Sequence, residues 1–297
     1  MTKPISATPS AVLSRTAVLA LLTRWCPHNW RLGLGSSILL LILLCAIFAP
    51  WLAPHSPYDQ SLTDRLLRPM FMEGGSWAHP LGTDHLGRDY LSRLLYGARF
   101  SLLVGFGTIV LSAFIGIGMG VAAGYFAGKV DLIVMFILTV RLSLPIMLAT
   151  LAIVGLLGNS LPLMMLVLAC FLWDHFLVVA RSLTLRLREA EFVLAAKASG
   201  YSDLRIMISE ILPNLVGPLV VVATLEMGHA ILLEAAFSFL GLGIRPPDAS
   251  WGLMIAEAKD FVFFEPWLVN IPGLAIFILI TAITLLGAGL QRLLVKD

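Results

Sequence analysis

Residues 100–126 read FSLLVGFGTIVLSAFIGIGMGVAAGYF and contain no charged side chain. A helix needs about 20 mostly apolar residues to cross the hydrocarbon core of a bilayer, so this stretch predicts a membrane-spanning helix. Small residues recur at every fourth position, at Ser112, Gly116, Gly120, Gly124 and Gly128. Such a ridge lets the backbone of a neighbouring helix approach closely. We expect tight packing within a helix bundle, with a moving interface between gating helices as the alternative.

The composition of the whole chain agrees with a membrane location. The 297 residues are 59% hydrophobic and 13% charged, with a mean hydropathy of +0.92. An ordinary soluble domain is about half apolar and about a quarter charged, which argues against a cytosolic enzyme, a disordered protein or a secreted disulfide scaffold. The net charge of +2 offers no electrostatic case for binding nucleic acid.

Five further apolar stretches accompany the first. Their residues are continuous rather than alternating, which favours helices over the strands of a membrane barrel. We therefore predict an all-α membrane protein with six transmembrane helices, at 33–52, 100–126, 132–157, 161–180, 215–239 and 268–290. The corresponding organisation is an N-terminal segment 1–32, a first helix 33–52, an outer loop 53–99, and a core 100–297 that contains a loop at 181–213.

The distribution of basic residues predicts the orientation. Twelve Lys and Arg residues fall on the side of the N-terminus and seven on the other, which leaves Arg141 within a span. By the positive-inside rule both termini are then cytoplasmic, and the loop 53–99 is periplasmic. The basic flank before the first span is typical of an uncleaved signal anchor and consists of Lys3, Arg15, Arg24 and Arg31.

Ionisable residues inside the spans are candidates for the lining of a translocation path. Glu226, His229 and Glu234 fall within an arc of about 140° on the fifth span. Such groups face protein or a water-filled path, because facing lipid is costly. They line a path or form buried hydrogen bonds, and a metal site at Glu226 and His229 is a weaker alternative.

The third span carries a fourth candidate, Arg141, together with a proline. Arg141 needs a partner, for which Asp174 and His175 in the fourth span are candidates by depth. Pro145 predicts a kink, which opens a path or fits a neighbouring helix.

The cytoplasmic segment EAEFVLAAKASGYSDLRIMISEILPN, residues 189–214, is amphipathic but too short and too charged to span a membrane. It predicts a helix from about Arg188 to Ser199, which Gly200 ends and after which Ser202 or Asp203 starts a new turn. We expect Leu212-Pro213 to restart the chain into the fifth span. We interpret this arrangement, in which a glycine joins two short helices within a loop, as a docking element.

In this segment the chain resembles the ABC importer permeases. Ala195-Ala196-x3-Gly200 followed by Leu212-Pro213 is similar to their EAA loop, with Leu194 where the family usually has Glu. The resemblance implies a coupling helix that fits a groove in an ATPase subunit. The implied ATPase-coupling residues are Glu191, Ala195, Ala196, Lys197, Gly200, Leu212 and Pro213.

Other segments resemble the C-type permeases of the dipeptide/oligopeptide/nickel family. LGTDHLGRD at 81–89 is similar to their signature before the second span, and FSFLGLG at 237–243 and PGLA at 272–275 match after the fifth span and in the sixth. The resemblance implies the type I ABC importer permease fold, a heterodimer with a homologous permease, two ATPase subunits and a periplasmic or lipid-anchored binding protein. The periplasmic signature residues are Gly82, Thr83, Asp84, Gly87, Arg88 and Asp89.

The signature loop allows two interpretations. Asp84, Arg88, Asp89 and Arg93 alternate in charge at helical spacing, which favours a self-satisfied network. The alternative is that this face, with the loop 245–267, docks the binding protein.

No ATP-hydrolysing motif is found. A phosphate-binding loop needs Gly-x4-Gly-Lys-Ser/Thr, whereas the nearest string, Gly124 to Val130, has three residues between its glycines and lacks the Ser/Thr. We therefore expect a chain that is not an enzyme by itself and binds no cofactor or metal, with ATP and Mg²⁺ held by partner ATPase subunits.

The expected function is import of di- or oligopeptides across a bacterial inner membrane. A nickel or metal-chelate importer permease is the first alternative, since Glu226 and His229 offer donor atoms within the membrane. The second alternative is an ATP-independent secondary transporter, although such carriers usually show internal repeats, and we find none in the sequence.

Overall fold

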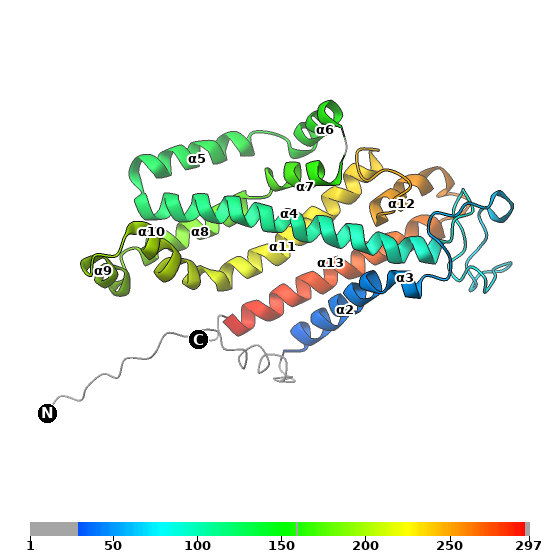
Figure 1. Ribbon diagram of the computed structural model, residues 1–297, viewed down its shortest axis with the longest axis horizontal. Coiled ribbons are helices and arrows are strands. Elements are labelled where there is room, and N and C mark those ends of the chain that lie inside the picture. Colours follow the sequence, from blue (N-terminus) through cyan, green and yellow to red (C-terminus); the bar gives the residue numbers. More distant parts are fainter. Residues whose placement is uncertain (1–28, 159, 295–297) are drawn as a thin grey trace.

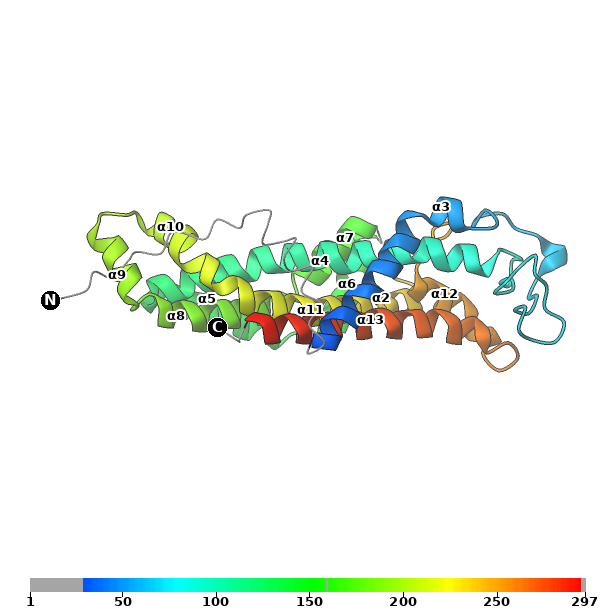
Figure 2. The same ribbon diagram turned by 90° about the horizontal axis from the view of Figure 1, so that it is seen from below.

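The computed structural model describes residues 29–158 and 160–294, which form helices and, apart from one isolated bridge between Thr83 and Asp89, contain no strand pairing. In these ranges five helices are long and apolar enough to cross a membrane, and a bent pair brings the number to six if it is one span. The molecule is elongated along its helices (Figures 1 and 2). The all-α prediction is confirmed. Lys3, Arg15 and Arg24 lie outside the described residues.

The first predicted span, 33–52, is divided between two helices. Helix α2 covers Trp30–Ile47 and the short helix α3 covers Ala49–Leu52. Pro50 lies in the first turn of α3, where its missing N–H costs nothing. Phe48 separates the two helices, and after α3 the chain enters a loop that includes the 3₁₀ turn η2 (Leu62–Asp64).

Helix α4 (Tyr90–Phe126) is longer than the predicted span because it begins well before residue 100. The Asp89 side chain accepts a hydrogen bond from the Ser92 N–H and so caps the first turn. The predicted outer segment 53–99 therefore contains the first turns of this helix, because the cap starts it at Tyr90. The signature residues thus lead directly into the longest helix.

The glycine ridge of α4 packs against α8 (Asp174–Leu187), which follows α7 (Leu161–Ala169). A Cβ added at Gly120 would lie 2.6 Å from the Leu177 carbonyl oxygen, and one at Gly124 would lie 2.7 Å from Thr184 Cβ. The interpretation as tight packing is confirmed. Gly128 is not part of the ridge, because it lies beyond α4 with a φ of +53°.

The predicted third span, 132–157, is broken rather than merely kinked. Helices α5 (Gly128–Leu142) and α6 (Ile146–Leu157) meet at 83°. Pro145 explains the break, because it lacks an N–H and disfavours the helical conformation of the residue before it. An ion pair between Arg181 Nη2 of α8 and Asp131 Oδ2 of α5, 2.6 Å apart, holds α5 in place.

The coupling segment forms α9 (Glu191–Ala198), α10 (Asp203–Ile206) and a π-helical turn, η3 (Met207–Ile211), before α11 (Leu212–Phe239). The helix predicted at 188–199 begins three residues later in the structure, at Glu191, because α8 continues to Leu187 and Ala190 is extended. Gly200 ends α9 with a φ of +80°, and Ser202 caps α10, as predicted.

Leu212-Pro213 does not restart the chain, which corrects the prediction. A single helical run extends from Asp203 to Phe239. The Leu212 N–H bonds to the Met207 carbonyl five residues back, and this wide turn accommodates Pro213, which lacks an N–H. Helix α10 is therefore connected to α11 by continuous helix, and α9 is joined to α10 by the turn at Gly200.

The two ends of the molecule differ in their elements (Figure 1). Helices α9 and α10 lie at one end. At the other lie α3, the loop before α4, α12 (Trp251–Ala258), η4 (Lys259–Phe261) and the start of α13 (Trp267–Leu294). There Trp251 Nε1 donates to the Leu94 carbonyl at 2.8 Å, and the Tyr90 hydroxyl donates to the Leu268 carbonyl.

Candidate functional site

Helix α9 has one anchored face and one exposed face. Val193 and Ala196 are buried in a core cluster that also contains Phe176 of α8 and Ile211 of η3. Phe192, Leu194 and, after the turn, Leu204 leave large apolar side chains exposed. An exposed apolar patch on a polar loop is typical of a protein interface.

The predicted ATPase-coupling residues divide between these two faces. Glu191, Ala195, Lys197 and Gly200 are exposed, whereas Ala196 packs inward. Leu212 and Pro213 form the first turn of α11, where Leu212 is partly buried and Pro213 is exposed. The exposed residues of α9 and its end are therefore candidates for contact with an ATPase subunit, and Ala196 and Leu212 connect them to the helix bundle.

A second group of charges joins the candidate spans, and we call it the span cluster: Arg141, Asp174, His175, Glu226 and His229. Arg141 Nη1 lies 2.8 Å from Asp174 Oδ2, which confirms Asp174 as its partner. His175 Nδ1 lies 2.9 Å from Glu226 Oε1, and His229 Nδ1 lies 3.3 Å from the same oxygen. His175 thus pairs mainly with Glu226 rather than with Arg141.

The span cluster is open on one side. The Glu226 carboxylate is buried, but the side chains of His175 and His229 are 62% and 58% exposed. Buried polar atoms of Arg141, Asp174 and Glu226 have no hydrogen-bond partner within the described residues. Buried polar groups normally have partners, so this face is completed by water, substrate or another chain.

Glu234 is separate from this cluster, although it lies on the same helix as Glu226. Its Oε1 accepts hydrogen bonds from Ser238 Oγ at 2.7 Å and Ser250 Oγ at 2.8 Å, and its side chain is buried. The predicted arc of three residues therefore divides into two sites. Glu234 joins α11 to the start of α12 through Oε1, while its buried Oε2 has no hydrogen-bond partner within the described residues.

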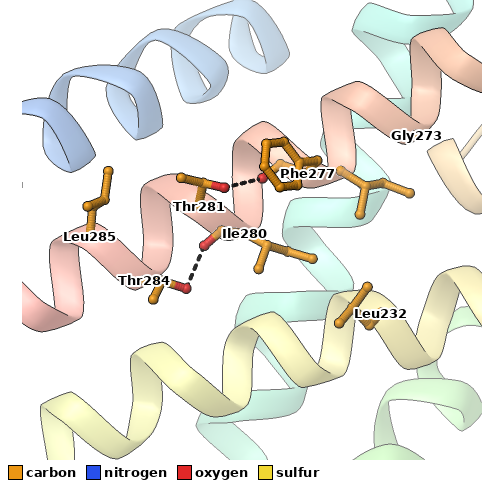
Figure 3. Close-up of a pocket in the computed structure, with 8 residues that line it drawn as sticks. Leu232, Gly273, Phe277, Ile280, Thr281, Thr284 and Leu285 are labelled. Atoms are coloured by element: carbon orange, nitrogen blue, oxygen red, sulfur yellow. Dashed lines mark hydrogen bonds between the residues drawn. The ribbon is translucent and has the colours of Figure 1, made fainter.

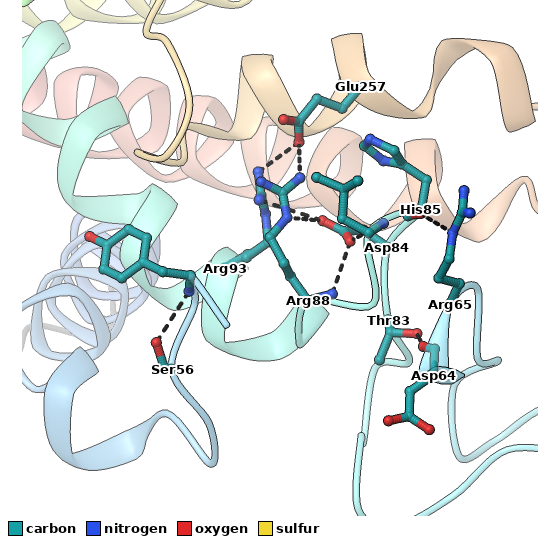
Figure 4. A network of polar contacts seen from close by, with 11 residues as sticks. Ser56, Asp64, Arg65, Thr83, Asp84, His85, Arg88, Arg93 and Glu257 are labelled. Carbon is teal, nitrogen blue, oxygen red and sulfur yellow. Dashed lines mark hydrogen bonds and ion pairs between the residues drawn. The ribbon is translucent and has the colours of Figure 1, made fainter. Parts of the chain in front are cut away.

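The periplasmic signature contributes to an outer network, defined by Asp84, Arg88, Arg93 and Glu257 (Figure 4). Arg88 Nε lies 2.6 Å from Asp84 Oδ2, and Arg88 Nη2 lies 2.9 Å from Glu257 Oε2. Arg93 Nη2 approaches the same Glu257 oxygen at 2.7 Å. The Arg93 side chain is 0% exposed and that of Glu257 is 16% exposed. The charges of the network pair within the chain, although Nε and Nη1 of Arg93 have no hydrogen-bond partner within the described residues, and the network is buried rather than on the surface.

The remaining signature residues shape the loop around this network. Gly82 and Gly87 adopt φ values of +76° and +75°, and the Thr83 hydroxyl bonds to the Asp64 carbonyl. Asp84 Oδ1 accepts the backbone N–H groups of Leu86 and Arg88. These residues face the protein itself, so docking of a binding protein on this face stays a prediction that rests on their exposed neighbours.

Two histidines that the sequence analysis did not select lie beside Asp89. His79 Nδ1 is 2.8 Å and His55 Nδ1 is 3.6 Å from Asp89 Oδ1. They are far apart in the sequence and match no metal-binding spacing, so no motif could have identified them. In the described residues these three form the only group of at least three His, Cys, Asp or Glu side chains with converging ligand atoms.

An apolar groove lies between α11 and α13 (Figure 3). It measures about 480 Å³, and its lining includes Leu232, Phe277 and Ile280. Its two hydroxyl groups, on Thr281 and Thr284, donate to carbonyls of their own helix. The groove therefore suits a lipid chain or another apolar helix better than a charged peptide.

Known proteins match nearly the whole chain. The family model of binding-protein-dependent transport system inner membrane components matches residues 98–297, and that of the N-terminal transmembrane domain of oligopeptide transport permease C matches 29–69. The di/tripeptide transport system permease protein DppC of Pseudomonas aeruginosa is 40% identical over 89% of this chain and 87% of its own length. The dipeptide permease DppC of Escherichia coli is 41% identical over 86% of each chain.

A solved structure supports the fold. The inward-facing MetNI methionine ABC transporter aligns with a TM-score of 0.56 and 17% identity, over 68% of this chain and 96% of the matched chain. At this level of identity the likeness concerns the arrangement of helices and not the substrate.

Proposed function

This chain belongs to the binding-protein-dependent transport system inner membrane components, the permease subunits of ABC importers, and from that premise we propose that it carries di- or tripeptides. The relatives that match over most of their length are named for dipeptide or di/tripeptide transport. These names favour a peptide over nickel as the substrate. The chain is a multi-pass membrane subunit, and we place it in the bacterial inner membrane with both termini in the cytoplasm.

The structural observation that supports an ATP-driven importer is helix α9. Val193 and Ala196 anchor it, Phe192 and Leu194 are exposed on it, and it projects from one end of the bundle. In the proposed assembly an ATPase subunit covers the exposed face. ATP and Mg²⁺ bind at the ATPase subunits, and their closure pushes α9, which transmits the movement through the continuous helix 203–239.

The span cluster faces the partner permease or the path between the two permeases. Its two exposed histidines and buried Glu226 carboxylate offer hydrogen bonds and negative charge to a zwitterionic peptide. In this role Glu226 attracts the peptide ammonium group, and Arg141 with Asp174 fixes the position of the neighbouring helix. A binding protein delivers the peptide from the end of the molecule opposite α9.

Reconstitution tests the proposal. The chain is purified with the products of neighbouring genes and inserted into liposomes, and ATP hydrolysis is measured with peptide-loaded binding protein. We expect two ATPase subunits to co-purify and a dipeptide to raise ATP turnover and uptake together. Stimulation by nickel alone would overturn the peptide assignment, and uptake by the isolated chain without ATP would overturn the importer mechanism.

A further inference from the structure

We propose that His55, His79 and Asp89 form a binding site for a divalent first-row transition metal ion, with Zn²⁺ as its best-suited ligand. The three residues belong to the segment between α3 and the start of α4, which lies at the end of the molecule opposite α9 (Figure 1), and they share no residue with the span cluster. The site brings together the segment after α3, the segment before the signature, and the start of α4. The inference does not depend on the proposed function.

The geometry of the three side chains suits a small cation. The two Nδ1 atoms lie 2.8 Å and 3.6 Å from Asp89 Oδ1, and one ligand atom from each residue lies within 4.8 Å of the other two. Tetrahedral Zn²⁺ with ligands at about 2.0–2.2 Å requires neighbouring ligand atoms roughly 3.3–3.6 Å apart. Small side-chain rotations bring the three atoms to that spacing.

The two oxygens of Asp89 have different tasks. Oδ2 accepts hydrogen bonds from the Ser92 N–H and the Ser92 hydroxyl, at 2.8 Å and 2.7 Å, and so caps α4. Oδ1 is directed to the histidines and is not needed for the cap. Helix capping therefore explains the position of Oδ2 only. A cap does not require the two imidazoles that face Oδ1.

The surroundings support the three ligands from outside. Ser92 Oγ also accepts the His55 N–H at 3.3 Å, so one serine fixes both Asp89 and the backbone of His55. Hydrogen-bonded supports of this kind are usual around metal ligands. The Asp89 carboxylate is buried, whereas His55 is 44% exposed, which provides an entry route and a solvent-facing fourth position.

The donor set points to a particular class of metal. Two imidazoles and one carboxylate suit Zn²⁺, Ni²⁺ or Cu²⁺ better than Mg²⁺ or Ca²⁺, which prefer all-oxygen sites. The alternative is a pair of histidines that share protons with Asp89 and bind no ion. Titration of the protein with the metal ion at one fixed pH distinguishes metal binding from protonation of the histidines.

Zinc binding to the purified full-length chain, with the subunits that accompany it, tests the site. The protein is first treated with a chelator, and binding is then followed by calorimetry and by the shift in melting temperature. His55→Ala and His79→Ala should each weaken the site by at least about tenfold. His85→Ala is the matched control, because His85 belongs to the same loop but stacks on Phe261.

Equal zinc affinity in wild type, His55→Ala and His79→Ala would overturn the proposal, as would the absence of saturable binding to the wild type. A partner subunit that binds zinc would contribute equally to all variants and cancel in the comparison. If His79→Ala misfolds, His55→Gln removes a more exposed ligand and still tests whether the site binds zinc. Co²⁺ gives a second readout, since its visible spectrum should change on loss of either histidine.

Discussion

The outer network and the span cluster contain similar charges in very different surroundings. In the outer network two guanidinium groups face two carboxylates, and Arg93 is wholly enclosed. In the span cluster one carboxylate faces two histidines whose side chains are mostly exposed. Within the described residues both groups contain buried polar atoms without a hydrogen-bond partner, so they differ in exposure: the first is enclosed by the chain, and the second presents two exposed histidines. The comparison supports the proposal that the enclosed charges serve stability and that the open ones serve transport.

The outer network and the span cluster also differ in their position along the helices. The outer network ties α12 to the start of α4 beyond the apolar part of the helices, where loops must be held in a fixed shape. The span cluster lies where α5, α8 and α11 meet, and an unsatisfied charge there would be expensive in lipid. The cost of placing such charges in a span is the reason for proposing that this face is functional.

Removal of the Arg93 charge gives the largest expected effect and tests the enclosed side of the comparison. Arg93→Met leaves Glu257 and Asp84 with less positive charge in a buried site, which costs about 3–5 kcal/mol. We expect the melting temperature of the purified complex to fall by at least about 6 °C. Arg68→Met is the control, because Arg68 and Glu265 form an exposed pair worth at most about 1 kcal/mol.

An Arg93→Met protein that melts like the wild type would contradict the structural role of the outer network. Loss of uptake with unchanged stability would instead place Arg93 in the docking of a binding protein.

The next effect concerns the packing that positions the span cluster. Gly120→Leu places side-chain atoms against the Leu177 carbonyl and pushes α8 away from α4, at a cost of about 1–3 kcal/mol. Because α8 begins at Asp174, both stability and uptake should decrease. Gly118→Leu on the same helix is the matched control, since among the described residues nothing lies within 4 Å of its added Cβ. Equal effects of the two variants would refute this packing argument.

A smaller effect on stability, but a distinct one on function, is expected at the turn after α9. Gly200 has a φ of +80°, so Gly200→Val strains the turn by about 1–2 kcal/mol. The strain should displace the exposed face of α9 and so uncouple ATP hydrolysis from uptake. The outer network and the span cluster should remain intact. Normal uptake per ATP hydrolysed in this variant would count against α9 as the coupling element.

The sequence predicted much of the fold because spans and glycine ridges are local signals. Residues 100–126 and Gly120 were interpreted correctly from pattern alone. The break at Pro145 was underestimated, since sequence shows that a proline disrupts a helix but not how far neighbours allow it to bend. The π turn before Leu212 was missed for a similar reason, because tertiary packing decides whether a helix stops or adjusts.

The candidate sites were less predictable, because they depend on long-range contacts. Depth gave Asp174 and His175 as candidate partners of Arg141, of which Asp174 is the one in contact. Helical spacing grouped Glu226 with Glu234, although the two belong to different sites. His55 and His79 converge on Asp89 only through the folding of the outer loop. No short motif records such a contact.

The central claim is tested most directly by substituting Glu226 and Glu234 separately in the reconstituted importer. Glu226→Gln should reduce dipeptide uptake by at least about tenfold, equivalent to about 1.4 kcal/mol, with little change in melting temperature. Glu234→Gln should keep near-normal uptake, because its remaining carbonyl oxygen can still accept the two serine hydroxyl groups. Full uptake with a lowered melting temperature in Glu226→Gln would contradict the account, because it would make the span cluster structural.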